Sequence, residues 1–83
     1  MENRVTVLFV IHKRHEEHEL SIPLDISAND LVSALNSAYN LGIQTQNIKN
    51  CYLQSENPIA LLKGNKTMEE FGIRNGSRIN YTR

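Results

Sequence analysis

Three histidines are the residues of this sequence whose type and spacing are best suited to chemistry. His12, His15 and His18 recur at every third position within a wholly polar stretch. Imidazole nitrogens bind zinc and related metals, and Glu16 or Glu17 would add an oxygen ligand. Without cysteines or a fixed scaffold, however, such a set binds metal weakly. We therefore predict no metal site; a pH-sensitive loop is the simpler alternative, because histidine titrates near neutral pH.

Cys51 is the single cysteine and the other candidate for reaction chemistry. One cysteine excludes an intrachain disulfide and a four-cysteine zinc site, and it favours a reduced, cytoplasmic protein. The strand pattern around Cys51 predicts that its thiol points into the core, where it is inert. The acidic residues lie at turns and helix starts, where capping explains them, and Lys63–Lys66 lacks the pattern of a phosphate-binding loop. The sequence therefore predicts no enzyme, no catalytic residue and no cofactor.

Composition and charge limit the classes of function further. The chain has 83 residues, 40% of them hydrophobic, and nine Lys and Arg balance nine Asp and Glu. These values are typical of one small globular domain, here residues 1–83, with little room for a deep substrate pocket. A neutral chain does not favour nucleic-acid binding. The longest apolar run, Val7–Ile11, is far shorter than the roughly 18 residues of a membrane span, so we expect no insertion into a membrane.

The N-terminal third predicts a β-hairpin. Alternation of apolar and polar residues predicts a strand over Val5–Ile11. Its core-facing residues are expected to be Val5, Val7, Phe9 and Ile11. The polar stretch His12–Glu19 predicts a charged tip, and a second strand, Leu20–Leu24, follows it. Because Pro23 cannot donate a backbone hydrogen bond, we expect this strand at a sheet edge.

A helix is predicted to follow, from about Ala28 to about Asn40. Ser27 is a suitable N-cap, and Asp30 three residues later suits the helix dipole. Gly42 supplies the stop, because glycine adopts the left-handed conformation that ends helices. The expected buried stripe consists of Leu31, Ala34, Leu35 and Ala38.

The second half of the chain predicts shorter elements. A third strand covers Ile48–Gln54, and a short fourth strand covers Ile59–Leu62. Thr67 and Glu70 have the spacing of a capping box, which predicts one helical turn. The last strand, Arg78–Thr82, is expected beside the first, whose other side is open. The elements thus predict an α+β roll, a mixed sheet of four or five strands with one main helix and a short helical turn.

This order of elements, together with the segment Leu62–Ile79, resembles the ubiquitin-like β-grasp fold. The apolar positions in the second half of that fold correspond here to Met68, Phe71, Ile73 and Ile79. The free-standing length and the run Gly72–Gly76 are most similar to the YukD/EsaB family, small ubiquitin-like accessory proteins of type VII secretion systems in Gram-positive bacteria. The resemblance implies a cytoplasmic component that binds protein components of the membrane secretion machine and through them lies near the inner face of the cell membrane. The oligomeric state stays open between a monomer and a weak dimer.

Two other classes of function stay open at this point. One is a small auxiliary subunit of a multicomponent enzyme, since β-grasp subunits of similar size occur in bacterial oxygenases. The other is a modifier or sulfur carrier, whose C-terminal carboxylate must thread a narrow channel and therefore follows Gly-Gly. This sequence ends Asn80-Tyr81-Thr82-Arg83. We therefore expect neither conjugation nor thiocarboxylate chemistry.

The face of the predicted sheet away from the helix is the expected protein-binding surface. Leu8, Val10 and Tyr52 lie there if the strand alternation holds. Apolar side chains on adjoining strands can form a docking patch, and the exposed sheet face is a common docking surface of ubiquitin-like proteins. The alternatives are that a loop, a second copy or a register shift of one residue buries them. The hypothesis predicts that charged residues at positions 8 and 10 abolish binding and leave the fold intact.

Overall fold

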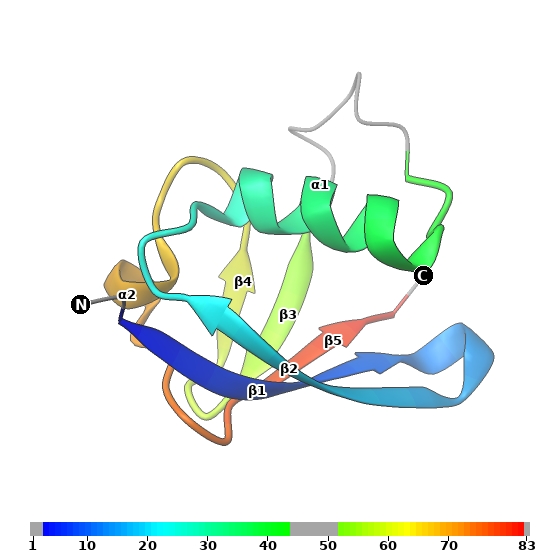
Figure 1. The fold of residues 1–83 in the computed structure, drawn as a ribbon, viewed down its shortest axis with the longest axis horizontal. Coiled ribbons are helices and arrows are strands. Elements are labelled where there is room, and N and C mark those ends of the chain that lie inside the picture. Colours follow the sequence, from blue (N-terminus) through cyan, green and yellow to red (C-terminus); the bar gives the residue numbers. More distant parts are fainter. Residues whose placement is uncertain (1–2, 44–51, 83) are drawn as a thin grey trace.

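The computed structural model describes residues 3–43 and 52–82 of the chain. In these ranges the chain forms five strands and two α-helices (Figure 1). The strands are β1 (Arg4–Ile11), β2 (Glu16–Pro23), β3 (Leu53–Glu56), β4 (Ala60–Leu62) and β5 (Arg78–Tyr81), and the helices are α1 (Ala28–Tyr39) and α2 (Met68–Phe71). A short 3-10 helix, η1 (His12–Arg14), forms the tip of the β1–β2 hairpin. Neither α-helix in the described ranges is long and apolar enough to cross a membrane.

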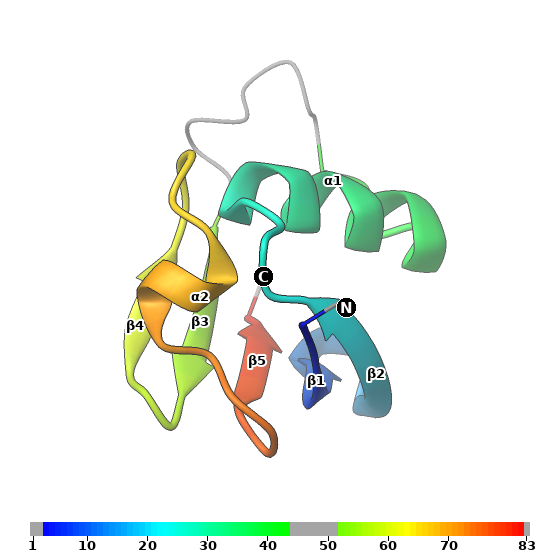
Figure 2. The same ribbon diagram turned by 60° about the vertical axis from the view of Figure 1, so that its left-hand side comes forward.

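The described strands form one mixed sheet in the order β2-β1-β5-β3-β4. β1 and β5 are parallel, whereas β2 pairs with β1, and β3 pairs with both β4 and β5, in antiparallel fashion. Figures 1 and 2 both show α1 lying across one face of this sheet. The predicted α+β roll is confirmed, including the position of the last strand beside the first.

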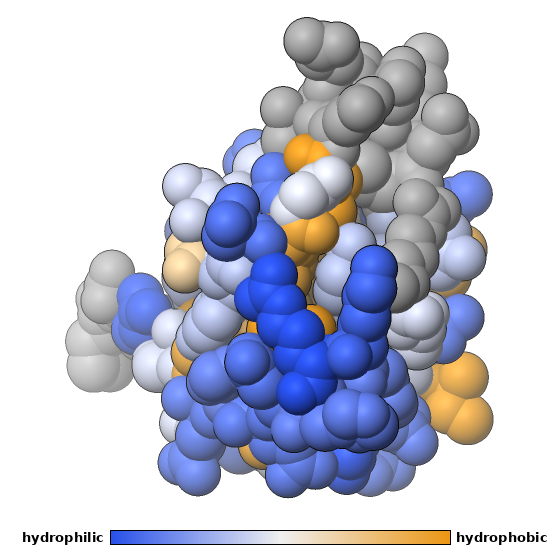
Figure 3. All heavy atoms as spheres, turned by 90° about the vertical axis from the view of Figure 1, so that its right-hand side faces the viewer, coloured by the Kyte–Doolittle hydropathy of each residue, from blue (hydrophilic) through white to orange (hydrophobic). Residues whose placement is uncertain are grey.

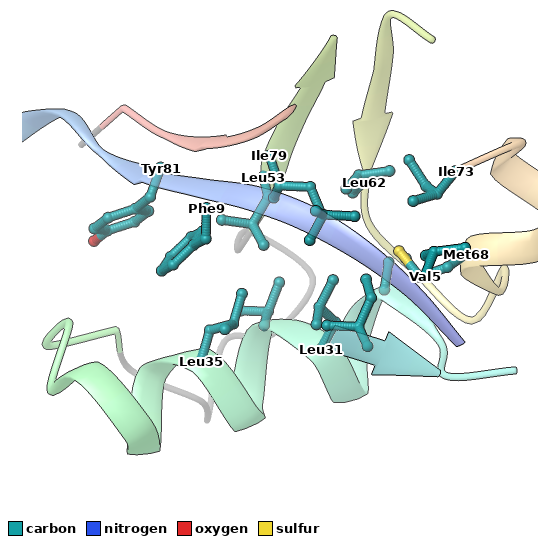
Figure 4. Close-up of a cluster of buried hydrophobic side chains, with 14 of the residues drawn as sticks. Val5, Phe9, Leu31, Leu35, Leu53, Leu62, Met68, Ile73, Ile79 and Tyr81 are labelled. Carbon is teal, nitrogen blue, oxygen red and sulfur yellow. The ribbon is translucent and has the colours of Figure 1, made fainter. Parts of the chain in front are cut away.

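The hydrophobic core lies between α1 and the sheet (Figure 4). Phe9, Leu62 and Met68 have no exposed surface, and Phe9 contacts the ring of Tyr39 at a centroid distance of 5.4 Å. The predicted inward residues of β1, namely Val5, Val7, Phe9 and Ile11, all belong to this core. The period-two pattern of the first strand therefore predicts the correct face.

The hairpin tip is shorter than predicted. Backbone pairing continues as far as Ile11 and Glu16, so β2 begins at Glu16 instead of Leu20. Because β2 is an edge strand, its polar side chains reach solvent without interrupting the backbone ladder. Pro23 lies on this edge strand, as predicted. His15, with a left-handed φ of 55°, closes the tip.

The helix α1 begins at the predicted cap. The hydroxyl of Ser27 accepts a hydrogen bond from the backbone N–H of Asp30 at 3.1 Å, and Asn40, with a φ of 53°, ends the helix. From the hairpin tip, Arg14 donates hydrogen bonds of 2.6 Å to the carbonyl groups of Tyr39 and Asn40. These bonds satisfy carbonyl groups that have no partner inside the helix, and they tie the tip to the helix end.

The buried face of α1 differs in part from the prediction. The buried residues of the helix are Ala28, Leu31, Val32 and Leu35. Leu31 and Leu35 are as predicted, whereas Ala34 and Ala38 are exposed. Val32 removes more apolar surface from water than an alanine does, so the face that contains it is the one that packs on the sheet.

The strand β3 extends further than predicted, to Glu56. Ser55 is only 3% exposed, and its hydroxyl donates a hydrogen bond of 2.6 Å to the carbonyl of Pro58. Because this buried hydroxyl has a partner, a serine is tolerated on the inner side of the strand. The predicted start of the strand at Ile48, and Cys51 with its predicted inward thiol, lie outside the described residues.

The short helix α2 begins with the predicted capping box. The backbone N–H of Thr67 donates to Oε1 of Glu70 at 3.0 Å, and the N–H of Glu70 donates to Oγ1 of Thr67 at 3.2 Å. The hydroxyl of Thr67 also donates to Oε1 at 3.1 Å. The two bonds that Thr67 donates favour the ionised carboxylate, the backbone bond most strongly, and hold the pKa of Glu70 below its ordinary value of 4.5.

We expect the free energy of unfolding to depend on the ionisation of Glu70. A carboxylate whose pKa is lower in the folded state adds stability above the unfolded value of 4.5, and this contribution is lost as the pH falls through the folded pKa. Glu70→Gln should therefore destabilise the protein at neutral pH, and the difference from wild type should close below pH 4.5. Urea unfolding at a series of pH values measures this, with Glu69→Gln as the control outside the capping box. A difference that persists in acid would contradict this origin.

Candidate protein-interaction surface

The face of the sheet away from α1 contains Leu8 and Val10, two of the three residues predicted to bind a protein. Successive side chains of a strand alternate between the two faces, so the positions outside the core form what we call the outer face. The outer face consists of Arg4, Thr6, Leu8 and Val10 of β1, Glu17, Glu19 and Ser21 of β2, Gln54 and Glu56 of β3, Leu61 of β4 with Ile59 directly before that strand, and Arg78 and Asn80 of β5. Two kinds of surface share it: a polar network at its centre and an apolar pair beside β4.

The polar network connects several strands at the centre of the outer face. Asn80 is 7% exposed; its Nδ2 donates to Oε2 of Glu56 at 3.0 Å, and its Oδ1 lies 2.9 Å from Nε2 of His12. Because the amide nitrogen donates to the carboxylate, Oδ1 is an acceptor, and we assign a hydrogen to Nε2 of His12. Arg78 lies between two carboxylates, 3.3 Å from Oε2 of Glu56 and 3.2 Å from Oε1 of Glu17. The network therefore fixes these side chains relative to one another.

Leu8 and Val10 lie on the outer face but differ in exposure. Leu8 is half-buried, whereas Val10 is only 5% exposed. Val10 pairs in register with Glu17 and Asn80, whose polar side chains flank it and leave little of it open. The expectation that Val10 is exposed is therefore wrong, while its part in binding stays a prediction, and a charge placed there would be largely buried. Tyr52 is half-buried and lies directly before β3.

The most exposed apolar side chains lie at positions that the sequence pattern did not single out. Among the described residues, the exposed large hydrophobic side chains are Ile59, 92% exposed, and Leu61, 42% exposed. They line a hollow of about 530 Å³ that His12 and Thr82 also line, and we call it the β4 hollow. The run Ile59–Leu62 is apolar at every position, and an edge strand that buries one face must expose the alternate residues. That continuous run was the signal that could have identified them.

The three histidines do not converge on one point. His12 faces the outer network, while His18 stacks against Tyr39 at 4.6 Å and contacts Oε1 of Glu16 at 3.1 Å on the opposite side of the sheet. His15 lies in the left-handed turn of the tip. Within the described ranges, no group of three or more His, Cys, Asp or Glu side chains is placed to hold a metal ion.

The β4 hollow is suited to binding. Burial of an exposed isoleucine such as Ile59 by a partner gains about 1.5–3 kcal/mol from the removal of apolar surface from water. The neighbouring Asn80 and Glu56 are already fixed by hydrogen bonds, so they lose little conformational freedom on association. The arrangement therefore combines an apolar anchor with an ordered polar border.

Comparison with known proteins identifies the family of the chain and confirms its fold. A family model described as WXG100 protein secretion system (Wss), protein YukD, matches residues 3–80. No curated protein matches the sequence. The C-terminal ubiquitin-like domain of mouse tubulin-specific chaperone e is 11% identical with a TM-score of 0.74, over 95% of this chain and 84% of that one. A ubiquitin-like domain from tubulin-binding cofactor B is 21% identical with a TM-score of 0.75, over 96% and 89%. These similarities confirm the predicted ubiquitin-like fold.

Proposed function

We propose that this chain, which belongs to the YukD family of the WXG100 protein secretion system, acts as a non-enzymatic protein-interaction module. In this role it is a single ubiquitin-like domain and an accessory or regulatory component of a type VII secretion system. It works in the cytoplasm and reaches the inner face of the membrane only through protein components of the machine. The observation that supports this proposal most is the β4 hollow, where Ile59 is 92% exposed beside fixed polar side chains.

We place the contact on the outer face, with Ile59 and Leu61 at its centre. Leu8 and Tyr52, both half-buried, are further candidates for contact outside this centre, whereas Val10, 5% exposed, offers a partner little surface. One sheet face of so small a domain offers a modest area, and such areas are typical of transient contacts or of subunits within a larger assembly. A flat, ordered sheet face is the part of this fold that a partner can contact without rearrangement of the core.

Crosslinked affinity capture from the native cells, membranes included, tests this proposal. The tagged protein should retain components of the secretion system that an untagged strain does not yield. Recovery of a large soluble oxygenase in their place would move the assignment to an auxiliary enzyme subunit. A covalent adduct at the C-terminus, seen as added intact mass, would support a modifier or sulfur carrier instead.

A further inference from the structure

A second hollow lies between the hairpin tip and the end of α1, away from the outer face. It measures about 470 Å³, and we call it the tip hollow. Its lining consists of Ile11, Lys13, Arg14, Leu41, Gly42 and Tyr81. Figure 3 looks onto this end of the molecule, where hydrophobic side chains reach the surface between hydrophilic ones. The tip hollow therefore has apolar and charged walls in close proximity.

The charged side chains that line the tip hollow are both cationic. The guanidinium of Arg14 is held in place by its two bonds to the carbonyl groups at the end of α1, and it keeps further N–H groups for other acceptors. Lys13 is exposed and has no ion-pair partner among the described residues. Glu16 and Glu17, the acidic residues next along the chain, are bonded to other side chains. Among the described residues, the rim of the tip hollow thus carries a net positive charge.

Tyr81 adds a hydroxyl group to the floor of the tip hollow. Its ring belongs to the core and is 9% exposed, but in Figure 4 its hydroxyl points away from the buried cluster. This hydroxyl has no hydrogen-bond partner among the residues that the structure describes. It is therefore available to donate to an acceptor that enters the hollow.

We propose that the tip hollow binds a carboxylate side chain of a partner protein, with a neighbouring apolar side chain of the same segment against Leu41. Charge complementarity decides the occupant: a basic segment is repelled by Lys13 and Arg14, and a purely apolar one leaves both cations without a partner. A carboxylate accepts hydrogen bonds from both cations and from the hydroxyl of Tyr81, and the apolar floor excludes water from these bonds. This binding site does not depend on the β4 hollow, which lies on the other side of the sheet.

NMR titration of the full chain with a short blocked peptide of alternating glutamate and leucine tests this proposal. The amide signals of Lys13, Gly42 and Tyr81 should shift in a saturable manner. The same peptide with glutamine in place of glutamate should bind at least about fivefold more weakly, because the charge-assisted hydrogen bonds are lost. Lys13→Gln should weaken binding several-fold, and Tyr81→Phe, which keeps the buried ring, should do the same. Both variants change exposed or hydroxyl atoms only, so their spectra should retain the native dispersion.

Several results would overturn the proposal. One is that the glutamine peptide binds as tightly as the glutamate peptide, and another is that inorganic phosphate alone does so. The others are signal shifts confined to residues of the β4 hollow, and no saturable shift of any signal. Secretion-system capture that depends on Ile59 but not on Lys13 would leave the proposed function in place while the tip hollow fails. The two proposals are therefore distinguishable by experiment.

Discussion

Phe9→Ala is expected to lower the free energy of unfolding by about 3–5 kcal/mol, because it removes a fully buried aromatic ring and leaves a cavity. The ring contacts Tyr39 and belongs to the layer between β1 and α1. Since small domains are stable by only about 5–15 kcal/mol, this one change should remove a large share of the total. Urea unfolding followed by circular dichroism measures the loss.

Leu8→Ala, at the preceding residue of the same strand, is the matched control. Leu8 is half-buried on the outer face, so its truncation should cost about 1 kcal/mol. If Phe9→Ala does not fold at all, Phe9→Leu should show a smaller loss in the same direction. Equal losses at positions 8 and 9 would contradict the assignment of the two faces of β1.

Ile59→Asp is expected to weaken capture of the partner at least tenfold, which corresponds to about 1.4 kcal/mol or more, as is usual for an apolar anchor at the centre of an interface. Because Ile59 is 92% exposed, the free energy of unfolding should stay within about 0.5 kcal/mol of wild type. This separation of binding from stability is sharper than charged substitutions at Leu8 and Val10 allow, since Val10 is buried. Quantitative capture at several bait concentrations measures the effect.

Ala34→Asp supplies the matched control, because it places the same carboxylate on the exposed side of α1. It should leave capture unchanged. Loss of binding in both variants would indicate a non-specific effect of charge, and unchanged binding in Ile59→Asp would remove the β4 hollow from the contact.

Local signals in the sequence explain much of the fold. The Ser27 cap and the capping box of Thr67 and Glu70 form as predicted, because each depends on residues three positions apart. The alternation in β1 also identifies the core face, because it too depends only on residues close together in the sequence. The hairpin tip was predicted too long, since hydropathy describes side chains and the backbone ladder of an edge strand does not require apolar ones.

The candidate site was harder to predict, because its contacts join residues that are distant in sequence. Arg78 and Glu17 are 61 positions apart, and His12 and Asn80 are 68 apart. Alternation alone places Val10 on the outer face, but only the register with β2 and β5 reveals the polar side chains that flank it. The exposure of Ile59 depends on β4 being at the edge of the sheet, which is again a property of the assembled topology.

The most direct test of the central claim, that the outer face binds a component of the secretion system, is site-specific photocrosslinking in living cells. A photoreactive residue replaces Ile59 in one strain and Ala34, on the exposed side of α1, in another. We expect position 59 to crosslink to a secretion-system component and position 34 not to do so. Crosslinks from position 34 with none from position 59, or no crosslink to any secretion-system component from either, would contradict the claim.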